Sequence, residues 1–425
     1  MLIKKLNELY KVVVLGAGYA GITLATRLAK KIKKITLVDA NQHHELIQQA
    51  HLVAGGIKKE EEVRYNIQQI IENSNIHFIK SVVKKIKADE KKVILEDKDI
   101  GYELLVVALG ATTQSFGIKN IKKYCLTLQS IDDALAIKDE VQNLIDQKKK
   151  DKFVKRKEEK KEGVDYIVIV GGGPTGTGIA GTISELVNKS GQSERIKITL
   201  VTASSTILQN WDSRIIDEST KILQRKGVHI LVNSYVNNVK ENDIVLENGQ
   251  KIYSSLIIWT PGVMGFDLPF APDIEKTKDE RIVVNEFCQI NKFPDVFGIG
   301  DIAAIKDSSG KIQNPPLGQI AISQAIYLAE TIPEFFIKGK RPTEKFDYDV
   351  KIKILPMGED DYVGTIDGSL VKGKIAKILK EFRYKAYKED IISDKPIIND
   401  ILYKDDPVSN LRLGILLGSV LSKKS

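Results

Sequence analysis

A Gly-x-Gly-x-x-Gly loop occurs twice in this chain, each time between a β-branched run and a segment of helical pattern. The first loop runs from Gly16 to Gly21 and the second from Gly171 to Gly176. In such a loop the first glycine permits a tight turn, the second lets the backbone approach a diphosphate, and the third lets helix and strand pack closely. The diphosphate lies at the positive end of the helix dipole. One loop is weak evidence, but the pair predicts two nucleotide-binding units rather than two ordinary α/β turns.

The likeness between the two units continues into their next strands. The seven residues from Lys34 and the seven from Lys197 are identical except that Thr202 replaces Asp39. A carboxylate about 20 residues after the glycines binds both hydroxyls of an adenosine ribose, so the first unit is predicted to hold an adenine dinucleotide such as FAD. Thr202 lacks the charge and the second oxygen, which predicts a weaker hold on the second nucleotide. Ser204 and Ser205 are able to hydrogen-bond a 2′-phosphate, but no arginine stands beside them, so NADH and NADPH both stay open.

Length and cysteine content narrow the class of protein. A chain of 425 residues with 42% hydrophobic and 28% charged residues is expected to fold as two or three soluble domains. Cys125 and Cys288, the only cysteines, stand in no metal-binding or Cys-x-x-Cys spacing, which predicts a reducing compartment, no disulfide framework and no metal site. The start resembles no secretory signal, and no apolar run reaches the roughly 18 residues of a membrane span. We therefore expect an intracellular protein.

The formal charge of +8 is concentrated in one tract. Nine basic and three acidic residues lie between Lys148 and Lys161. We interpret this tract as an exposed insertion, either simply solvated or attracted to anionic lipid or a partner. Nucleic acid is not expected as a partner, because no stacking aromatic residues are interleaved with the basic ones.

Alternating strand and helix patterns predict an α/β fold with two Rossmann-like dinucleotide-binding units, the second inserted in the first. The first unit would comprise residues 1–115 and 285–335, closed by a strand that ends at Gly300 and Asp301. The second unit would comprise residues 116–284. Ligands of such parallel sheets collect at the carboxyl ends of the strands, which favours a ligand role for Asp301 over that of a helix N-cap.

Residues 336–425 are predicted to form a smaller α+β region. A strand is expected near 349–355 and a helix from Val371 to Lys388. The helix has an apolar stripe edged by basic residues, which suits a membrane headgroup layer and equally a surface helix covering its own sheet. An apolar tail, Leu411–Leu421, favours attachment to one face of a membrane. The stripe consists of Ile375, Ile378, Leu379, Phe382 and Ala386, and the basic residues are Lys374, Lys377, Lys380, Arg383, Lys385 and Lys388.

Together these motifs resemble the type II (single-subunit) NADH dehydrogenases, membrane-surface flavoproteins with two dinucleotide-binding units. The likeness covers most of the chain. Its more specific part is Pro315-Pro-Leu-Gly-Gln319-Ile-Ala-Ile-Ser-Gln324, which is similar to the quinone-site helix of that family. The other matching segments are the two glycine loops, Asn41–His44, Ala108–Thr113, Phe116–Ile118, Trp259–Val263 and Gly300–Ala304.

The resemblance implies electron transfer from NADH or NADPH through FAD to a membrane quinone beside Gln319 and Gln324. It implies a peripheral protein on the cytoplasmic face of the cell membrane, and a homodimer is possible. The residues implied to hold FAD are Gly16, Gly18, Tyr19, Ala20, Gly21, Asp39, Ala40, His43, Val83, Ala108, Gly110 and Asp301. Those implied for the nicotinamide nucleotide are Gly171, Gly173, Thr175, Gly176, Thr202 and Gly262.

Two departures from the family pattern lie in the second unit. One is Thr202, and the other is Gly178, which stands where the family usually has a glutamate. They keep two alternatives open: a quinone reductase with another electron donor, and a flavin-binding sensor with a degenerate nicotinamide pocket. A sulfide:quinone oxidoreductase would need a redox-active cysteine pair, and Cys125 and Cys288 do not match its positions.

Overall fold

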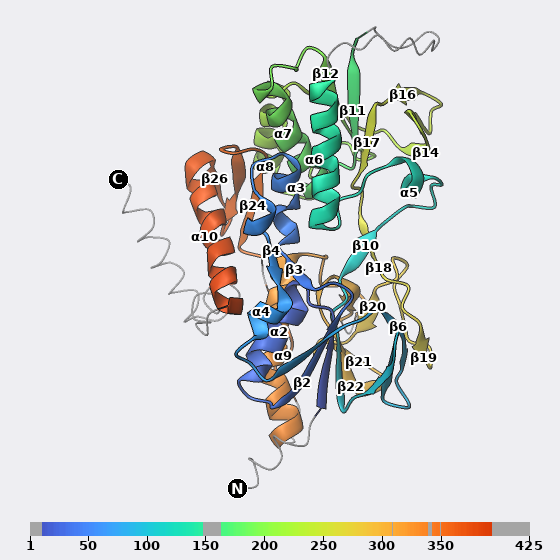
Figure 1. The fold of residues 1–425 in the computed structure, drawn as a ribbon, viewed down its shortest axis with the longest axis vertical. Helices are drawn as coiled ribbons and strands as arrows, with labels where there is room; N and C mark the ends of the chain where they lie inside the picture. Colours follow the sequence, from blue (N-terminus) through green and yellow to red (C-terminus); the bar gives the residue numbers. More distant parts are fainter. Residues whose placement is uncertain (1–10, 148–162, 308, 339–341, 349, 393–425) are drawn as a thin grey trace.

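The structure, a computed structural model, describes residues 11–147, 163–307, 309–338, 342–348 and 350–392. The basic tract 148–161 and the apolar tail Leu411–Leu421 therefore lie outside the described residues. Figure 1 shows two sheet-and-helix units stacked along the long axis, with the C-terminal elements along one side of the stack.

The first unit is built on a six-stranded sheet with the order β21-β22-β9-β1-β2-β5, parallel except for β21. Its inner strands are continuous runs of buried valine, leucine and isoleucine, as expected for a parallel sheet covered on both faces. Helices α2 and α9 pack along each other against it. These elements are β1 (Lys11–Leu15), α2 (Tyr19–Ala29), β2 (Lys34–Asp39), β5 (Ile76–Lys80), β9 (Leu104–Val107), β21 (Gln289–Ile290), β22 (Phe293–Gly298) and α9 (Gly318–Lys338).

Smaller elements complete the first unit. Strands β6, β7 and β8 form an antiparallel sheet to which β19 is added, and β3 pairs with β4 and β20 with β23. Short helical turns η1, η2 and η3 and helices α3 and α4 connect them. Their bounds are β3 (His43–Glu45), η1 (Ile47–Gln49), α3 (Ala50–Ala54), η2 (Glu60–Glu62), β4 (Arg64–Asn66), α4 (Ile67–Ile71), β6 (Val83–Lys87), β7 (Lys92–Leu95), β8 (Asp99–Gly101), β19 (Phe270–Ala271), β20 (Ile282–Val284), η3 (Gly300–Ile302) and β23 (Ala303–Ile305).

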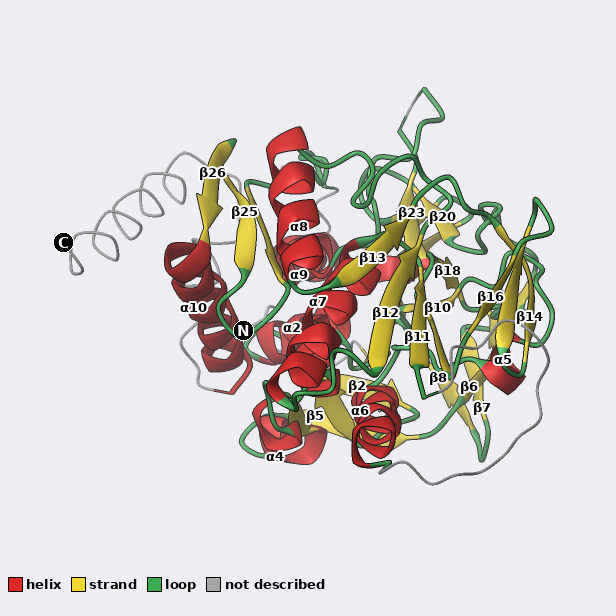
Figure 2. Cartoon of the chain, turned by 90° about the horizontal axis from the view of Figure 1, so that it is seen from above, coloured by secondary structure: helices red, strands yellow, loops and turns green. Residues whose placement is uncertain are grey.

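The second unit repeats the plan with the parallel order β13-β12-β11-β17 and an antiparallel sheet of β14, β15 and β16. Helix α7 leaves the glycine loop after β11, and α8 follows β12 (Figure 2). The bounds are α5 (Ile121–Tyr124), α6 (Ile131–Asp146), β11 (Asp165–Val170), α7 (Pro174–Lys189), β12 (Ile196–Val201), α8 (Ser213–Arg225), β13 (Val228–Leu231), β14 (Val236–Lys240), β15 (Asp243–Leu246), β16 (Lys251–Tyr253) and β17 (Leu256–Trp259).

The chain passes between the two units at an antiparallel pair of short strands, β10 (Ala111–Thr113) and β18 (Val263–Gly265). After β18, β19 already pairs with β6 and β20 with β23. Both partners belong to the first unit. We therefore propose that the return to the first unit occurs at β18, earlier than the expected boundary at residue 285.

The C-terminal region consists of the antiparallel sheet β24 (Ile352–Pro356), β25 (Tyr362–Ile366) and β26 (Ser369–Lys372), and of α10 (Gly373–Ile392). Helix α10 packs on β25 and β26 and also contacts α2, while β25 contacts α8. The region thereby touches both units (Figure 1). None of the helices within the described ranges combines the length and apolarity needed to cross a bilayer.

The predicted pattern of α10 is partly wrong. Lys380 and Arg383, expected among the solvated basic residues, are buried against the rest of the protein at 9% and 5% exposure, and Leu379 and Ala386 of the apolar stripe are buried beside them. The stripe is therefore divided. Its inward part covers the protein. Of the rest, Ile375 is exposed, whereas Ile378 and Phe382 are half-buried and line a cavity beside the helix, with Phe382 also packed against the core.

Lys226, at the end of α8, ties the C-terminal region to the second unit. Its Nζ donates to Glu185 Oε2 of α7 (2.6 Å) and to the Met357 carbonyl (2.9 Å), and lies 2.9 Å from Asp361 Oδ2. Only 8% of the side chain is exposed. Removing one member of a buried ion pair leaves the opposite charges unpaired, which is strongly destabilising.

We predict that Lys226→Met lowers the free energy of unfolding by about 3 kcal/mol. The matched control on the same helix is Lys221→Met, since Lys221 is 70% exposed and 3.6 Å from Glu218; it is expected to change stability by less than about 0.5 kcal/mol. Denaturant titration measures both values, and equal effects of the two substitutions would contradict a structural role for the buried cation.

Candidate nucleotide and quinone site

The three glycines of the first loop have three distinct roles. Gly16 has φ +99°, and a Cβ there would lie 2.3 Å from the Ala108 carbonyl oxygen. A Cβ on Gly21 would lie 1.8 Å from the Gly16 carbonyl oxygen. Around Gly18, which is exposed, a Cβ would meet nothing within 4 Å. Gly16 and Gly21 are thus required by the protein itself, whereas the bare backbone at Gly18 faces space that a ligand is able to occupy.

Asp39, at the end of β2, lies directly beside this loop. Its Oδ2 accepts from the Ala17 N–H and its Oδ1 from the Asn41 N–H, each at 2.7 Å. Burial raises the pKa of Asp39, and the two backbone hydrogen bonds oppose the rise. The carboxylate is therefore fixed at the carboxyl edge of the sheet, next to exposed Ala40 and half-buried His43.

Asp301 reaches the same loop from the other end of the chain. It lies in the turn η3, whose Gly300 has φ +74° and lies so close to α2 that a Cβ on it would be 3.3 Å from Ala20 Cβ. Asp301 Oδ1 is buried without a hydrogen-bond partner in the described structure. Burial raises the pKa of Asp301 to about 6, and Arg281 opposes the rise. The next helix begins at Gly318, so Asp301 is not its N-cap.

Gln324 supports this turn from α9. It is fully buried, and its Oε1 accepts from the Gly300 N–H at 2.7 Å. Its Nε2 is buried with no hydrogen-bond partner among the described residues. The sequence suggested that Gln324 faces a quinone. The structure instead places it behind the Gly300–Asp301 turn, where it holds the backbone in place.

Gln319 lies one turn earlier, at the start of α9. Its Nε2 donates to the Ile352 carbonyl at 2.8 Å, and its Oε1 is buried without a described partner. A Cβ on the neighbouring Gly318 would lie 1.9 Å from Gln48 Nε2, so η1 packs directly on the start of α9. Gln49, also on η1, has a buried Oε1 without a described partner. Buried polar atoms of this kind call for an explanation, and a bound ligand is one.

The second loop has the same construction as the first. Gly171 has φ +115°, and a Cβ on Gly176 would lie 1.8 Å from the Gly171 carbonyl oxygen, whereas Gly173 has open space around it. Thr175, next to Gly173, is exposed. Thr202 occupies the place of Asp39, but its hydroxyl packs 2.7 Å from the Cβ position of Gly172 and accepts only a 3.3 Å bond from the Ser204 N–H.

The remaining predicted contacts lie at the junction of the units or at the margin of the first. Gly110 has φ +73° with open space beside it, and Gly262 has φ +64° with the Phe116 ring 3.2 Å from its Cβ position. Both glycines flank the β10–β18 pair. Val83 begins β6 and is half-buried.

Helix α10 contributes a contact that the sequence did not reveal. His44 Nδ1 hydrogen-bonds the Ala17 carbonyl at 2.8 Å, and Tyr387 Oη lies 3.0 Å from His44 Nε2. Burial lowers the pKa of His44 to about 4. The neutral ring therefore donates from Nδ1 to the loop carbonyl and accepts from the tyrosine hydroxyl. The tilted ring of Tyr19 packs on Tyr387 with ring centroids 4.8 Å apart, so the C-terminal helix braces the first glycine loop.

The two cysteines do not form a redox pair. Cys125 ends α5 in the second unit, Cys288 is buried between β20 and β21 in the first, and both are free thiols. Burial raises the pKa of Cys125 to about 12 and that of Cys288 still further. Both thiols thus stay protonated at neutral pH, and thiols rather than thiolates are poor nucleophiles. Elsewhere in the described ranges no three His, Cys, Asp or Glu side chains are grouped to hold a metal ion.

We predict that two buried histidines make the protein acid-sensitive. Burial lowers the pKa of His44 and of His51 to about 4. An unfolded histidine titrates near pH 6.5, so below that pH the unfolded chain takes up protons that the folded chain does not. Stability should fall from about pH 6.5 down to about pH 4, by up to about 3 kcal/mol for each histidine.

Urea titrations across this pH range test the effect. His44→Gln and His51→Gln should each flatten the dependence of unfolding free energy on pH, while His77→Gln, at an exposed position of β5, should leave it as in the parent protein. An unaltered slope in the variant lacking both buried histidines would show that other groups cause the acid sensitivity.

Comparison with known proteins agrees with this geometry. Residues 10–325 match the model of the pyridine nucleotide-disulphide oxidoreductase family. The chain is 29% identical over 385 residues to the type II NADH:quinone oxidoreductase of Staphylococcus saprophyticus, covering 87% of this chain and 93% of that protein. The same values of identity and coverage hold for the Staphylococcus aureus enzyme.

Two solved structures share the fold. NDH2 from Plasmodium falciparum in complex with NADH superposes with a TM-score of 0.77 at 17% identity, over 88% of this chain and 94% of that one. The sulfide:quinone oxidoreductase of Aquifex aeolicus has a TM-score of 0.77 at 19% identity, over 94% and 96%. The chain belongs to the pyridine nucleotide-disulphide oxidoreductase family, and within it is similar to the type II NADH:quinone oxidoreductases.

Proposed function

We propose that this protein transfers electrons from NADH or NADPH through bound FAD to a membrane quinone. The observation that carries the proposal is a pair of glycine loops, each with open space at its second glycine. Asp39 lies beside the first loop, and Thr202 stands at the matching position of the second. FAD, when bound, would accept a hydride from the nicotinamide and pass two electrons on to the quinone.

The residues of the first unit fit FAD. Gly18 and the start of α2 would take the diphosphate, and Asp39 the adenosine ribose. Asp301, beside the same loop, has a free buried oxygen suited to a hydroxyl donor of the linking chain. Gln324 is a positioning residue, because it fixes the Gly300 N–H.

The second unit would bind the nicotinamide nucleotide at Gly173 and the start of α7. Because Thr202 supplies no carboxylate, the ribose is held through fewer and weaker hydrogen bonds. Gly110 and Gly262 flank the passage between the units, where a nicotinamide has to meet the flavin.

Gln319 is the candidate quinone contact. Its Nε2 has a second N–H to donate, and its Oε1 is without a described partner, so the amide is able to bind a quinone oxygen or the hydroxyl of the quinol. A sulfide donor is disfavoured, because Cys125 and Cys288 are separate, protonated thiols.

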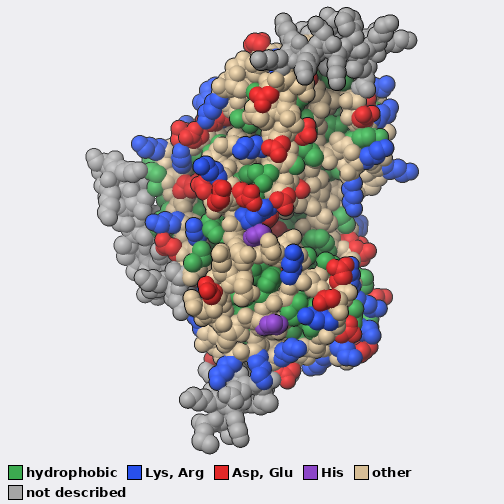
Figure 3. All heavy atoms as spheres, viewed as in Figure 1, with side chains coloured by type: hydrophobic (Ala, Val, Ile, Leu, Met, Phe, Trp, Pro, Cys, Tyr) green, Lys and Arg blue, Asp and Glu red, His purple; other side chains and the backbone are tan. Residues whose placement is uncertain are grey.

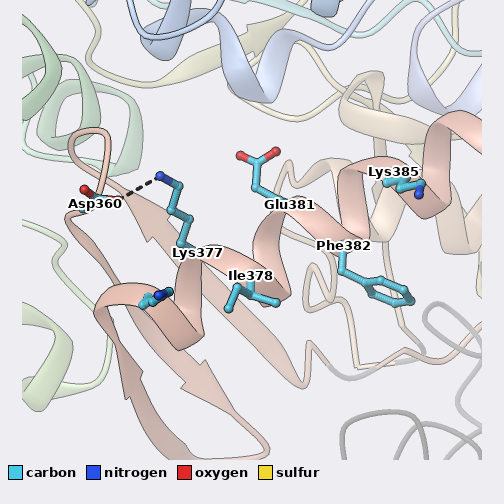
Figure 4. A pocket seen from close by; sticks show the side chains of 7 residues that line it. Asp360, Lys377, Ile378, Glu381, Phe382 and Lys385 are labelled. Carbon is cyan, nitrogen blue, oxygen red and sulfur yellow. Dashed lines mark hydrogen bonds and ion pairs between the residues drawn. The ribbon is translucent and has the colours of Figure 1, made fainter. Parts of the chain in front are cut away.

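We propose further that α10 lies at the membrane surface. The outer side of α10 carries a cavity of about 710 Å³, where Ile378 and Phe382 lie among basic residues (Figure 4). Its other lining residues are Asp360, Lys374, Lys377, Glu381 and Lys385. Apolar side chains edged by lysines suit the headgroup layer of an anionic bilayer. The resemblance to the type II NADH dehydrogenases favours the cytoplasmic face of the membrane for this attachment, and a homodimer is compatible with it.

On the face drawn in Figure 3, basic and acidic side chains are intermingled over both units. A nucleic-acid site requires basic side chains gathered in a stripe or patch. The side chains on this face therefore do not form the basic patch that a nucleic-acid site requires.

We predict that the purified protein is yellow, loses its colour with NADH or NADPH without oxygen, and regains it on addition of a quinone. Gly18→Ala should fold but retain much less FAD, because its methyl group occupies the diphosphate space. Gly173→Ala, the matched change in the second loop, should keep the flavin and require at least about tenfold more nucleotide for bleaching. Absorbance at the flavin band measures the bound FAD and its bleaching in the parent protein and in both variants. A colourless parent protein would refute the proposal.

We predict that reversing two exposed charges on α10 weakens membrane binding. Lys374→Glu with Lys385→Glu should lower co-sedimentation with vesicles of anionic lipid by at least about fivefold, since each basic residue contributes about 1 kcal/mol at such a surface. The control is Lys197→Glu with Lys221→Glu. It changes the net charge by the same amount, but on the second unit. Equal loss of binding in both double variants would argue against α10 as the contact.

A further inference from the structure

Gly178, on the second turn of α7, has a histidine where its side chain would be. A Cβ on Gly178 would lie 2.9 Å from Cδ2 and 3.3 Å from Nε2 of His51, which comes from α3 in the first unit. The sequence resemblance leads one to expect a glutamate at Gly178. In this chain the volume next to the glycine is filled by an imidazole instead.

The imidazole of His51 is held in one orientation. The side chain is 7% exposed, and its backbone carbonyl accepts from Thr182 Oγ1 of α7 at 2.9 Å. The carbonyl of Pro356 in β24 raises the pKa of the ring and so lies close to it, whereas Nε2 is buried with no partner in the described structure. Nε2 therefore has no hydrogen-bond partner on the side of Gly178, and a neutral imidazole with its hydrogen on Nδ1 would leave a lone pair there.

His51 is continuous with the candidate quinone contact. Gln49, two residues earlier, and Gln319 both have a buried Oε1 without a described partner. The contact between Gln48 and Gly318 joins η1 to the start of α9. Gln49 and Gln319 thus each have an unsatisfied buried oxygen near the contact of η1 with α9, and His51 follows on α3, which packs on α7. A polar ligand between these elements would satisfy such atoms.

We propose that His51 takes up and delivers the proton that quinone reduction consumes, and this inference rests on the proposed function. NADH or NADPH supplies two electrons and one hydrogen through the cofactor, whereas a quinol needs two electrons and two hydrogens. His51 Nε2 takes the second hydrogen from water as a proton and gives it to a quinone oxygen. The imidazole is neutral again when the quinol leaves.

The charges around His51 suit this role. Burial and the nearby Lys380 lower its pKa to about 4, and the Pro356 carbonyl opposes the shift. Lys380, from α10, is the charged group whose field reaches the ring, and burial and Arg383 lower the pKa of Lys380 itself to about 7; α7 presents Gly178 and Thr182, and β24 a carbonyl. His51 is therefore neutral at rest. Negative charge that develops on a quinone oxygen beside His51 would raise the pKa of the imidazole and favour its uptake of a proton.

Separate measurement of the two half-reactions tests the proposal. His51→Gln keeps a hydrogen-bonding side chain but cannot carry a proton. It should bleach with nucleotide at the parent rate, reoxidise with a water-soluble quinone at least tenfold more slowly, and lose the pH dependence of reoxidation. His77→Gln, at an exposed position, should behave as the parent protein in both half-reactions.

Melting temperatures of variants at Gly178 and His51, and ¹⁵N spectra, test the proposal without an activity assay. Gly178→Glu alone should lower the melting temperature, because the new side chain meets the imidazole, and His51→Ala in the same chain should restore it. The double variant should also recover reoxidation with a shifted pH profile. In ¹⁵N spectra of the flavin-loaded parent protein, a histidine signal lost in His51→Gln should show protonation only at Nδ1 at pH 7.

Reoxidation of His51→Gln at the parent rate and with the parent pH profile would overturn the inference, as would a resonance showing Nε2 protonated at pH 7. If instead the proposed function is wrong, the parent protein itself will neither bleach with nucleotide nor regain colour with quinone, so the two failures can be told apart.

Discussion

In each glycine loop the third glycine, at the start of a helix, packs against the carbonyl oxygen of the first glycine, and much of this structure depends on that contact. At Gly21 and again at Gly176, the helix after the loop runs so close to the loop that a Cβ would lie 1.8 Å from the carbonyl oxygen of the first glycine. Because of this approach, the N-termini of α2 and α7 point at the carboxyl edges of their sheets. Each sheet edge thereby gains free N–H groups and a positive helix end. Asp39 and Asp301 follow strands of the first sheet, and they are able to act on a ligand only because the helix N-terminus faces the same edge.

The C-terminal region holds the two edges in one arrangement. Tyr387 braces the first loop through His44, and Asp390 pairs with Arg27 of α2 at 3.2 Å. On the other side Lys226 joins α7 and α8 to the loop between β24 and β25. The Ile352 carbonyl of β24 accepts from both Gln319 and Arg383. One small sheet and one helix therefore connect both nucleotide units with the start of α9, where a quinone would bind.

Features encoded within a short stretch of sequence were predictable, and those that depend on distant packing were not. The glycine loops and the placement of Asp39 at the end of β2 follow from spacing along a strand and a helix. The role of Gln324 does not, because its partner Gly300 is identified only by the packing of α9 on η3. His51 and Gly178 lie 127 positions apart and meet only when α3 packs on α7. In α10, Lys380 and Arg383 fit the periodicity of a solvated face as well as that of a buried one, so sequence alone could not assign them.

The unequal construction of the two nucleotide sites matches the unequal tasks of a cofactor and a co-substrate. A flavin has to stay bound through each turnover, and the Asp39 carboxylate, fixed by two backbone N–H groups, would offer the FAD ribose charge-assisted hydrogen bonds worth about 1.5–3 kcal/mol each under the proposed function. A nicotinamide nucleotide has to leave after giving up its hydride. At Thr202 a single hydroxyl, packed against Gly172, offers at most a neutral bond of about 0.5–1.5 kcal/mol. A single weak hydrogen bond at Thr202 would speed the release of the second nucleotide, so the missing carboxylate fits the site of a co-substrate.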